Sequence, residues 1–490
     1  MQDIGPKRVS RWRSRCCLAL SVSAAALLAG CAHFSEDGGM LLVEERAGSE
    51  GQEVIKIRNE EEAAYAQARV QALLAAPLTA DAAVQVALLN NRGLQAAYNE
   101  LGISEAEMVE ASLPASPSFA LSKLFTTGQF EIERQIVQNV LGLLTLPRRR
   151  EIARERFRQA QVRAVGETLR TSAIARRAYY KAAAANQTVG FLEKARVSAE
   201  SASELSKKLG ETGAMSKLDQ AREHAFYAEV STQLAAARLQ QRSEREALSR
   251  ALGLWGGQTD YMLPGNLEHL PPPPPPIDDV ETQAVLSRAD LQIARMELDI
   301  LAKQYGLTRA TRFVNMLEVA GINTSDSTLV PQTNGEELPD KDKFNGYAIA
   351  FEIPIYDFGR ARTRLAEQSY MRGVNLLIEK AVNVRSQARE AYQAYRGGYD
   401  IARQFDKEIL PLRDIISEQT LLNYNGMLID LFELLADARA RITANVQAIE
   451  ARRNFWLAKV DLHVAIVGGG TDGTEITPGP ATLAASTGSD

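Results

Sequence analysis

The sequence predicts a mainly α-helical protein with a small β part, in which a unit of long antiparallel helices plus a β-hairpin occurs twice. Three observations support this prediction. The second half of the chain repeats the pattern of the first, two proline-poor stretches far exceed an ordinary helix, and short segments alternate apolar with polar residues. Helices of such length cannot bury themselves in one globular core, so we expect a bundle, a rod or a tube.

Residues 1–30 are predicted to be a secretory signal peptide. Five basic residues between Lys7 and Arg15 precede a short apolar stretch that ends at Ala29. The Leu-Ala-Gly-Cys sequence at Cys31 resembles a bacterial lipoprotein signal. That resemblance implies that Cys31 becomes the mature amino terminus and carries covalent lipid, which would hold the protein on a membrane. The alternative is an ordinary signal peptide followed by a chance cysteine.

The composition excludes several classes of protein. Apart from Cys31, the cysteines are Cys16 and Cys17 in the signal, so we expect neither a disulfide nor a cysteine metal site. The formal net charge is −5, and removal of five basic and one acidic residue with the signal makes it −9. A nucleic-acid-binding protein would be basic. No apolar run after the signal reaches the ~18 residues of a membrane-spanning helix, so any crossing would require a closed β-barrel.

The elements follow in the same order in both copies of the unit. An amphipathic helix is predicted over 78–113 and again over 280–310, where the pattern of residues 91–97 recurs at 288–294. Each is followed by a strand-rich region, a very long helix, a turn and a second long helix. The turn that begins at Gly213 corresponds to the turn that begins at Met427. These correspondences predict a duplicated fold.

The predicted organisation has six parts. Pro271 to Pro276 form an extended spacer between the copies, because a proline run offers no backbone donor. Residues 32–55 are predicted to be low in structure. The parts are a signal peptide (1–30), a lipid-anchored linker and further segment (31–77), a first repeat (78–252), a proline-rich spacer (253–280), a second repeat (281–467) and a disordered tail (468–490).

The long helices give the scale of the molecule. No proline occurs from Arg148 to Gly210, and only Pro411 occurs from Gly359 to Tyr424. A helix of about 63 residues would span roughly 95 Å. Apolar residues of the second copy recur in alternating three- and four-residue steps, which is a heptad seam. The seam residues are Val374, Leu377, Ala381, Val384, Ala388, Ala391 and Tyr395.

The strand-rich regions have a period of two. Apolar residues alternate with small or acidic ones from Tyr347 to Ile355, and a similar alternation runs from Phe130 to Val140, broken at Arg134. Residues 313–322 have mixed faces. Such alternation is typical of a transmembrane strand and equally of a half-buried strand in a soluble sheet. Two hairpins give four strands, too few to close a barrel, so several subunits would have to share one.

Several motifs together resemble the TolC-type outer-membrane efflux protein family. They are the Leu-Thr-x-x-x-Ala pattern at Leu78, the Asn-Asn-x-x-Leu-Gln pattern at Asn90 and the aromatic-Asp-x-Gly-Arg element ending at Arg360. The likeness covers residues 78–466. The first copy departs from it, because Leu-Pro-Arg replaces the aromatic-Asp-x-Gly-Arg element at Pro147. The second tip departs as well, with Met427 where the family has glycine.

The resemblance implies a homotrimer in the cell outer membrane. The copies would share a 12-stranded transmembrane β-barrel and a trimeric α-helical tube that projects across the periplasm. A periplasmic adaptor protein and an inner-membrane pump would be the partners, and outer-membrane lipid would surround the barrel. Residues 56–77 and 253–280 would form an equatorial belt around the tube. Ala32, rather than Asp, after the lipidated cysteine favours the outer over the inner membrane.

The resemblance also implies the functional residues. The periplasmic tips that contact the adaptor would include Gly213, Ser216, Gly426 and Met427. Asp219 and Glu433 occupy equivalent places after Gly213 and Met427, on the first turns of the returning helices, and are predicted to form the channel constriction. Carboxylates at these positions also favour the positive end of the helix dipole, so either role or both remain open.

The sequence offers no catalytic constellation and no metal site. The four histidines, among them His224, are scattered, and neither a phosphate-binding glycine loop nor a nucleophile turn is present. We therefore predict no cofactor beyond the lipid on Cys31. The predicted function is a passive conduit of a tripartite efflux system. A structural coiled-coil lipoprotein that tethers envelope layers is the alternative, although it leaves the alternating strands unexplained. A lipid-anchored periplasmic enzyme is a third possibility.

Overall fold

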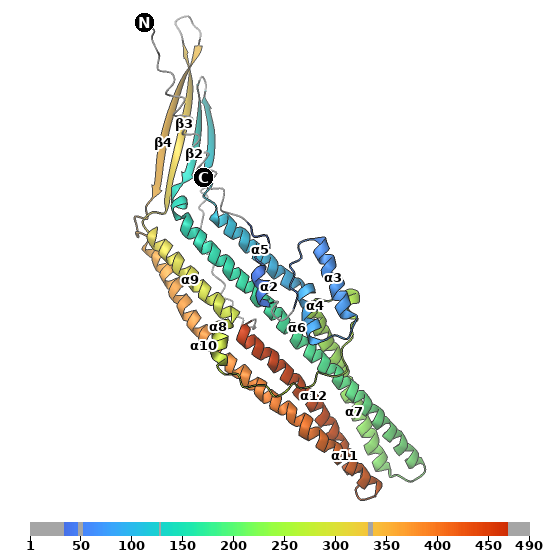
Figure 1. The fold of residues 1–490 in the computed structure, drawn as a ribbon. Helices are drawn as coiled ribbons and strands as arrows, with labels where there is room; N and C mark the ends of the chain where they lie inside the picture. The colour runs from blue at the N-terminus through green and yellow to red at the C-terminus, as the bar shows by residue number, and fades with distance from the viewer. Residues whose placement is uncertain (1–33, 48–51, 127–128, 332–336, 469–490) are drawn as a thin grey trace. The chain divides into compact units, whose positions relative to one another are not determined.

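The computed structural model describes residues 34–47, 52–126, 129–331 and 337–468 (Figure 1). The signal peptide, Cys31 and all but the first residue of the predicted tail lie outside these ranges. The chain forms two compact units, each assembled from three separate segments. Each unit takes residues from both copies of the repeat, so the duplication does not divide the chain into two domains.

Unit 1 comprises Met1–Lys56, Gln95–Val165 and Asp290–Asn383. It contains the sheet and the helices next to it. Its elements are α2 (Leu41–Ala47), α5 (Arg92–Ser112), β1 (Ser118–Thr126), β2 (Gln129–Asn139), the start of α6 (Val140–Glu211), α9 (Ala289–Ala310), β3 (Met316–Pro331), β4 (Glu337–Glu352) and the start of α10 (Arg360–Gln404).

Unit 2 comprises Ile57–Leu94, Gly166–Ala289 and Val384–Asp490. It is helical and contains both helical hairpins. Its elements are α3 (Glu60–Leu74), α4 (Ala80–Asn90), the rest of α6, α7 (Lys217–Leu252), η3 (Gly256–Thr259), α8 (Val280–Ser287), the rest of α10, η4 (Phe405–Ile409), α11 (Leu410–Asn425) and α12 (Leu431–Val467). Among the described residues, no helix combines the length and the apolar character needed to cross a membrane.

The helices predicted over 78–113 and 280–310 are each broken once. Asn91 and Arg288, which correspond to each other in the repeat, leave the helical region with ψ angles of 112° and 120°. The Asn91 side chain accepts a hydrogen bond from the backbone N–H of Leu94 at 3.2 Å, which caps the start of α5. The break therefore occurs at corresponding residues in the two copies, as the predicted repeat requires.

The first long helix begins earlier than predicted. α6 starts at Val140 rather than at Arg148, and it includes Pro147. The side-chain oxygen of Asn139, the last residue of β2, accepts a hydrogen bond from the N–H of Gly142 at 2.6 Å. This cap lets the helix follow directly on the strand, whereas proline had indicated a boundary.

The second long helix is interrupted, contrary to the single continuous helix expected. α10 ends at Gln404, and a π-helical turn, η4, precedes α11. Proline lacks an N–H and its ring crowds the carbonyl four residues earlier. Pro411 follows this turn directly, where the N–H of Leu410 bonds the carbonyl of Phe405. The wider turn accommodates the proline without ending the helix.

One antiparallel sheet contains the four predicted strands in the order β1-β2-β3-β4. β3 begins at Met316, so the ambiguous segment is largely strand. Two predicted boundaries are wrong, because Val140 belongs to α6 and β4 ends before Ile353. β1 and β4 each have one partner in the sheet, so each leaves a row of backbone groups unpaired along one edge.

Part of the predicted linker is structured. Residues 32–55 include α2, and the side chains of Met40 and Val43 are buried. The N–H of Ser35 also donates to the Glu105 carboxylate at 2.5 Å. The apolar run around α2 is too short for its periodicity to be distinguished from loop, so only packing against the remainder of unit 1 reveals it.

An aromatic cluster and the later part of the heptad seam, from Val384 to Tyr395, lie in the core of unit 2. Tyr180 of α6 stacks on Trp456 of α12 at 5.2 Å, and Phe455 packs against Tyr395 and Tyr399 of α10 at 5.6 Å. All seven predicted seam residues are buried or half-buried. Residues 271–276 contain no helix or strand, although η3 lies earlier in the predicted spacer. The carbonyl of Pro271 accepts a hydrogen bond from the Tyr399 hydroxyl at 3.3 Å.

Candidate functional site: the two helical tips

The first tip joins α6 to α7 through a left-handed turn at Gly213. Its φ angle is 78°, a region that glycine enters without steric cost. The N–H of Gly213 bonds the carbonyl of Gly210 at 3.1 Å, and the N–H of Ala214 bonds that of Leu209 at 2.8 Å. Ser216 then caps α7, its hydroxyl accepting from the Asp219 N–H at 3.1 Å.

The second tip, between α11 and α12, repeats this turn at the corresponding residues of the second copy. The N–H of Met427 bonds the carbonyl of Tyr424 at 3.0 Å, and the N–H of Leu428 bonds that of Asn423 at 2.9 Å. Met427 takes the left-handed conformation, with φ of 56°, and it is 92% exposed. Met427 therefore occupies the place of Gly213, while Gly426 has an ordinary negative φ of −78°.

Asp219 and Glu433 occupy the same position in the first turn of the returning helices, as predicted. The caps are Ser216 in the first tip and Asp430 in the second, whose carboxylate accepts from the Glu433 N–H at 2.9 Å. Asp219 also accepts a hydrogen bond from Ser216 and pairs with Arg222 at 3.3 Å. Glu433 is exposed and has no ion pair within the described part of the chain. The two carboxylates thus differ in how far a neighbouring cation offsets them.

The two hairpins pack against each other close to their tips (Figure 1). The guanidinium of Arg222 on α7 lies 5.7 Å from the ring of Phe432 on α12. Further from the tip, Arg439 of α12 pairs with Glu229 of α7 at 2.8 Å. An apolar cluster fills the space between these contacts. Its buried members are Ala199, Phe226, Val230, Leu431 and Leu435.

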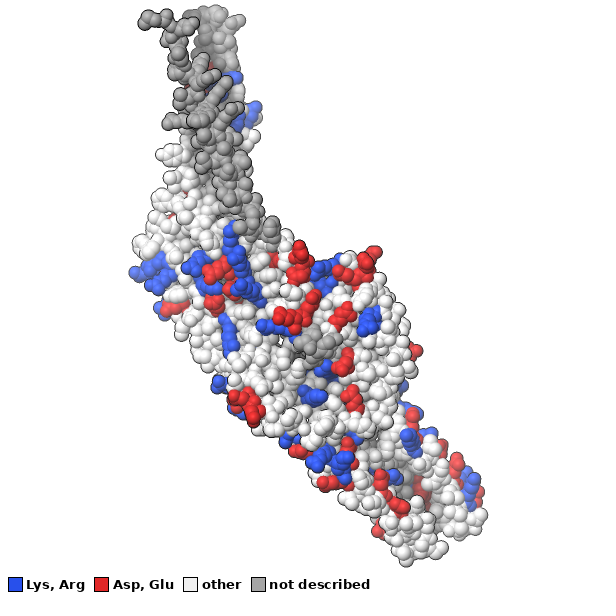
Figure 2. Space-filling model, in the orientation of Figure 1, with Lys and Arg blue, Asp and Glu red and all other residues white. Residues whose placement is uncertain are grey.

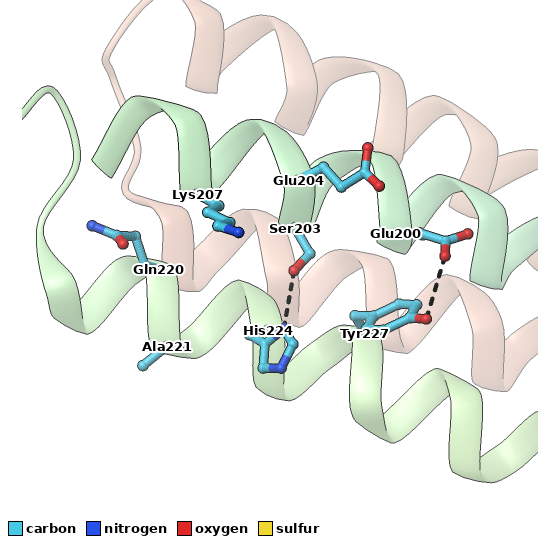
Figure 3. A pocket seen from close by; sticks show the side chains of 8 residues that line it. All are labelled: Glu200, Ser203, Glu204, Lys207, Gln220, Ala221, His224 and Tyr227. Atoms are coloured by element: carbon cyan, nitrogen blue, oxygen red, sulfur yellow. Dashed lines mark hydrogen bonds between the residues drawn. The ribbon is translucent and has the colours of Figure 1, made fainter. Parts of the chain in front are cut away.

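The first hairpin bears a groove of about 440 Å³ between α6 and α7 (Figure 3). The His224 ring nitrogen Nδ1 is 3.3 Å from the Ser203 hydroxyl, and the Tyr227 hydroxyl donates to Glu200 at 3.4 Å. The side chains of the groove are mostly polar. They are Glu200, Ser203, Glu204, Lys207, Gln220, Ala221, His224 and Tyr227. His224 is exposed here.

The two hairpins differ in the hydrogen-bond partner of one acid. In the second hairpin the Ser417 hydroxyl donates to Asp437 at 2.5 Å. The equivalent acid of the first hairpin is Glu223, which is 6% exposed, and its Oε2 has no hydrogen-bond partner in the described structure. Burial raises the pKa of the Glu223 carboxyl above its ordinary value. Glu223 was not predicted as a candidate, although its spacing from Phe226 and Val230 places it on the apolar stripe of α7.

The chemistry of the tips is that of hydrogen bonds and charge. Within the described residues, no group of histidine, cysteine, aspartate and glutamate side chains could hold a metal ion. Figure 2 shows acidic and basic side chains interspersed over the helices on the visible face. The features available for contact are therefore the exposed turns, the capped acids and the groove.

Among the solved structures that resemble this one are three outer-membrane channels. The Campylobacter jejuni channel CmeC has a TM-score of 0.65 at 16% identity, over 82% of this chain and 86% of that chain. VceC from Vibrio cholerae has a TM-score of 0.64 at 13% identity, over 82% of this chain and 97% of that chain. The open state of Neisseria gonorrhoeae MtrE has a TM-score of 0.57 at 17% identity, over 82% of this chain and 89% of that chain. No protein-family model and no curated protein matches the sequence. The chain has the TolC-type channel fold.

Within the TolC-type fold, the predicted tip residues lie at the turns of the two hairpins. Gly213 and Met427 form the turns, Ser216 caps α7, and Gly426 precedes the second turn. The exposed apolar side chains around them were not predicted. These are Leu218, Leu428 and Phe432, which are 60%, 76% and 59% exposed. Their signal in the sequence was their place within a few residues of the two turns, where core packing is not expected.

Proposed function

We propose that this protein is the outer-membrane channel subunit of a tripartite efflux system and works as a passive conduit across the periplasm and the outer membrane. It would act as a homotrimer, and it would not be an enzyme. Its tips would meet a periplasmic adaptor and, through it, an inner-membrane pump. Asp219 and Glu433 would line the periplasmic constriction.

The sheet provides the main observation that supports this proposal. It presents exposed apolar side chains on one face, among them Phe119, Tyr347 and Phe351, which are 74%, 82% and 62% exposed. It also has two open edges, at β1 and β4. Both features are costly in water and are removed when copies join edge to edge with the apolar face in lipid. Four strands per copy agree with a 12-stranded barrel for a trimer.

The alternative, a structural lipoprotein that tethers envelope layers, accounts for the helices alone. It gives no reason for a sheet whose large apolar side chains face outward. The exposed apolar residues at the tips, such as Met427 and Leu428, favour a partner at that end, because such side chains mark sites of protein contact.

The deciding experiment measures the assembly and its conductance. The full-length protein, expressed in a Gram-negative host and extracted in detergent, should have the mass of three chains and open discrete conductances in a planar bilayer. A detergent-independent monomer without conductance would contradict the channel and favour the tether.

We further propose that lipid on Cys31 anchors the mature protein, on the basis of the Leu-Ala-Gly-Cys sequence. Replacing Cys31→Ser should abolish labelling by a radioactive fatty acid and leave uncleaved precursor. Labelling equal to that of the unchanged protein would refute lipidation without touching the channel proposal.

A further inference from the structure

The sheet of unit 1 separates its charges by face. Its strands pair in continuous register, so directly opposed residues share a face and neighbours in sequence alternate. We consider residues 118–126, 129–139, 316–329 and 340–352, whose side chains are described. On one face, here the basic face, every charged residue is a cation. These residues are Lys123, Arg134, Lys341 and Lys343.

The other face, here the acidic face, holds every carboxylate of these ranges and no cation. Its charged residues are Glu131, Glu133, Glu318, Asp326, Asp340, Asp342 and Glu352. Large apolar side chains on it, such as Leu124 and Phe344, are scattered. An anion that approaches the basic face therefore meets no carboxylate of the sheet on that face.

The basic face is ordered along the strands. Apart from Gln138 and the Tyr347 hydroxyl, its rows nearest the helices hold no polar side-chain group, and they include the row of Phe119, Ile136 and Tyr347. Two rows further toward the hairpin turns, Lys123 and Lys343 share a row across the sheet, and Lys341 lies in the row after that. The row between them contains Arg134, Asn323 and Asn345, so the apolar rows are followed first by a polar row and then by the lysines.

The three lysines of the basic face have no hydrogen bond or ion pair within the described residues, whereas one nitrogen of Arg134 is hydrogen-bonded. Arg134 donates to the side-chain oxygen of Asn323 at 2.9 Å. Lys341 and Lys343 are exposed and have no hydrogen bond or ion pair within the described residues. The Lys123 ammonium lies 5.6 Å from the ring centre of Phe130, which leaves its donors free for another acceptor.

We propose that the basic face binds phosphate-bearing membrane lipid. Lys123, Lys341 and Lys343 would contact headgroup phosphates, while the apolar rows lie among the acyl chains. Long lysine side chains can reach from an apolar surface to the headgroups, and each lysine near an anionic surface adds to the affinity. The proposal rests on the proposed function, since it assumes that this face is turned to the lipid.

The test compares lipid binding with channel function. The full-length trimer is incubated with phosphatidylcholine vesicles that contain or lack lipid A, a lipid with two phosphates. Bound lipid A is counted by native mass spectrometry, and conductance is recorded in a phosphatidylcholine bilayer. The variant Lys341→Gln/Lys343→Gln is compared with Lys181→Gln/Lys194→Gln, which removes two exposed lysines of α6 instead.

The sheet variant should bind lipid A more weakly by about fivefold per lysine, hence about 25-fold, since each is worth about 1 kcal/mol at an anionic surface. The α6 control should bind like the unchanged protein. All three proteins should assemble and conduct equally. Equal lipid A binding by the sheet variant, with conductance intact, would overturn the lipid proposal alone. Loss of trimer and conductance in the unchanged protein would instead refute the proposed function.

Discussion

Glu223 is an acidic residue that is buried on an apolar helix face. It is on the apolar stripe of α7, one turn before Phe226, and its carboxylate is buried without a full set of partners. Its counterpart Asp437 has the Ser417 hydroxyl as a donor. Ser203, the counterpart of that serine, contacts His224 instead. Both copies therefore have the acid but differ in its partner, and we expect the unpaired oxygen of Glu223 to destabilise the first hairpin.

The raised pKa of Glu223 gives a stability prediction with a defined sign. Between the ordinary carboxyl pKa and the raised one, the folded protein binds more protons than the unfolded chain, so its stability falls as the pH rises through that window. Replacing Glu223→Gln should therefore raise the free energy of unfolding by about 1–3 kcal/mol at neutral pH. The gain should vanish below the ordinary pKa.

Chemical denaturation at pH 7.5 and pH 4 measures this effect. The matched control is Glu246→Gln, which alters an exposed acid on the same helix. A Glu223→Gln gain that is the same at both pH values would show that the residue is not protonated on folding in this range.

Met427 gives a second prediction at the residue scale. A left-handed conformation costs a non-glycine residue about 1–2 kcal/mol. Glycine raises the conformational entropy of the unfolded chain, which lowers the stability of the folded protein by about 0.4–1 kcal/mol. Met427→Gly should therefore stabilise the protein slightly, whereas Gly213→Met should destabilise it. Nothing lies within 4 Å of a Cβ placed at Gly213, so the loss would be conformational rather than steric.

Differential scanning calorimetry of the two variants checks the opposite signs. If Met427→Gly lowers the transition temperature as much as Gly213→Met does, the methionine is not strained and the two turns are not equivalent.

At the scale of the element, each returning helix begins with a capping residue and has an acid in its first turn. Ser216 and Asp430 satisfy the first N–H groups of α7 and α12, and Asp219 and Glu433 add a charge near the positive end of the helix dipole. Helix initiation alone thus explains why acids occur there. Passage of ions is a separate role that the caps neither require nor prevent.

We predict that replacing Asp219→Asn and Glu433→Gln together reduces cation preference in single-channel recordings. Like charges around a narrow opening attract cations, and a low-dielectric wall strengthens the effect. Glu433→Gln alone should have the larger effect, because Arg222 offsets Asp219. Stability should change by only about 0.3–1 kcal/mol per site.

The comparison is between reversal potentials in a salt gradient for the single and double variants. Glu408→Gln, which removes one exposed acid of η4 away from the tips, serves as the control for the single variants. A double variant with unchanged reversal potential would leave both acids with the dipole role alone.

At the scale of the whole molecule, the sheet leaves its apolar face and both edges uncovered. Copies that join edge to edge in lipid would satisfy both. Adjacent residues of β4 separate this idea from general strand stability, because Ile349 is on the basic face and Ala350 is on the acidic face.

Replacing Ile349→Lys should reduce the amount of membrane-inserted, heat-resistant oligomer, since a lysine facing lipid near the bilayer midplane costs about 2–4 kcal/mol. Ala350→Lys should be tolerated, because its side chain would face water beside Glu318 and Glu352. Semi-native electrophoresis of membrane fractions gives the measurement. Equal losses in the two variants would contradict the assignment of the faces.

The sequence by itself determined the order of the elements. The repeat, the period-two segments and the heptad seam predicted the duplicated helix and hairpin unit, its four strands and both tips, because these patterns are local and regular. It also placed Asp219 and Glu433 correctly at their helix starts. The alternation that predicted strands could not tell a membrane strand from a soluble one, since both bury one face.

The tertiary structure alone decided the features that depend on partners distant in sequence. Packing of Met40 and Val43 against the rest of unit 1 makes α2 a helix within the predicted linker. Glu223 is buried on the apolar stripe of α7, and the missing hydrogen-bond partner of its Oε2 follows from the side chains that surround it, which its spacing on the helix does not reveal. The segregation of charge on the sheet likewise requires the strand register, which brings Lys123 and Lys343 to one row from opposite edges.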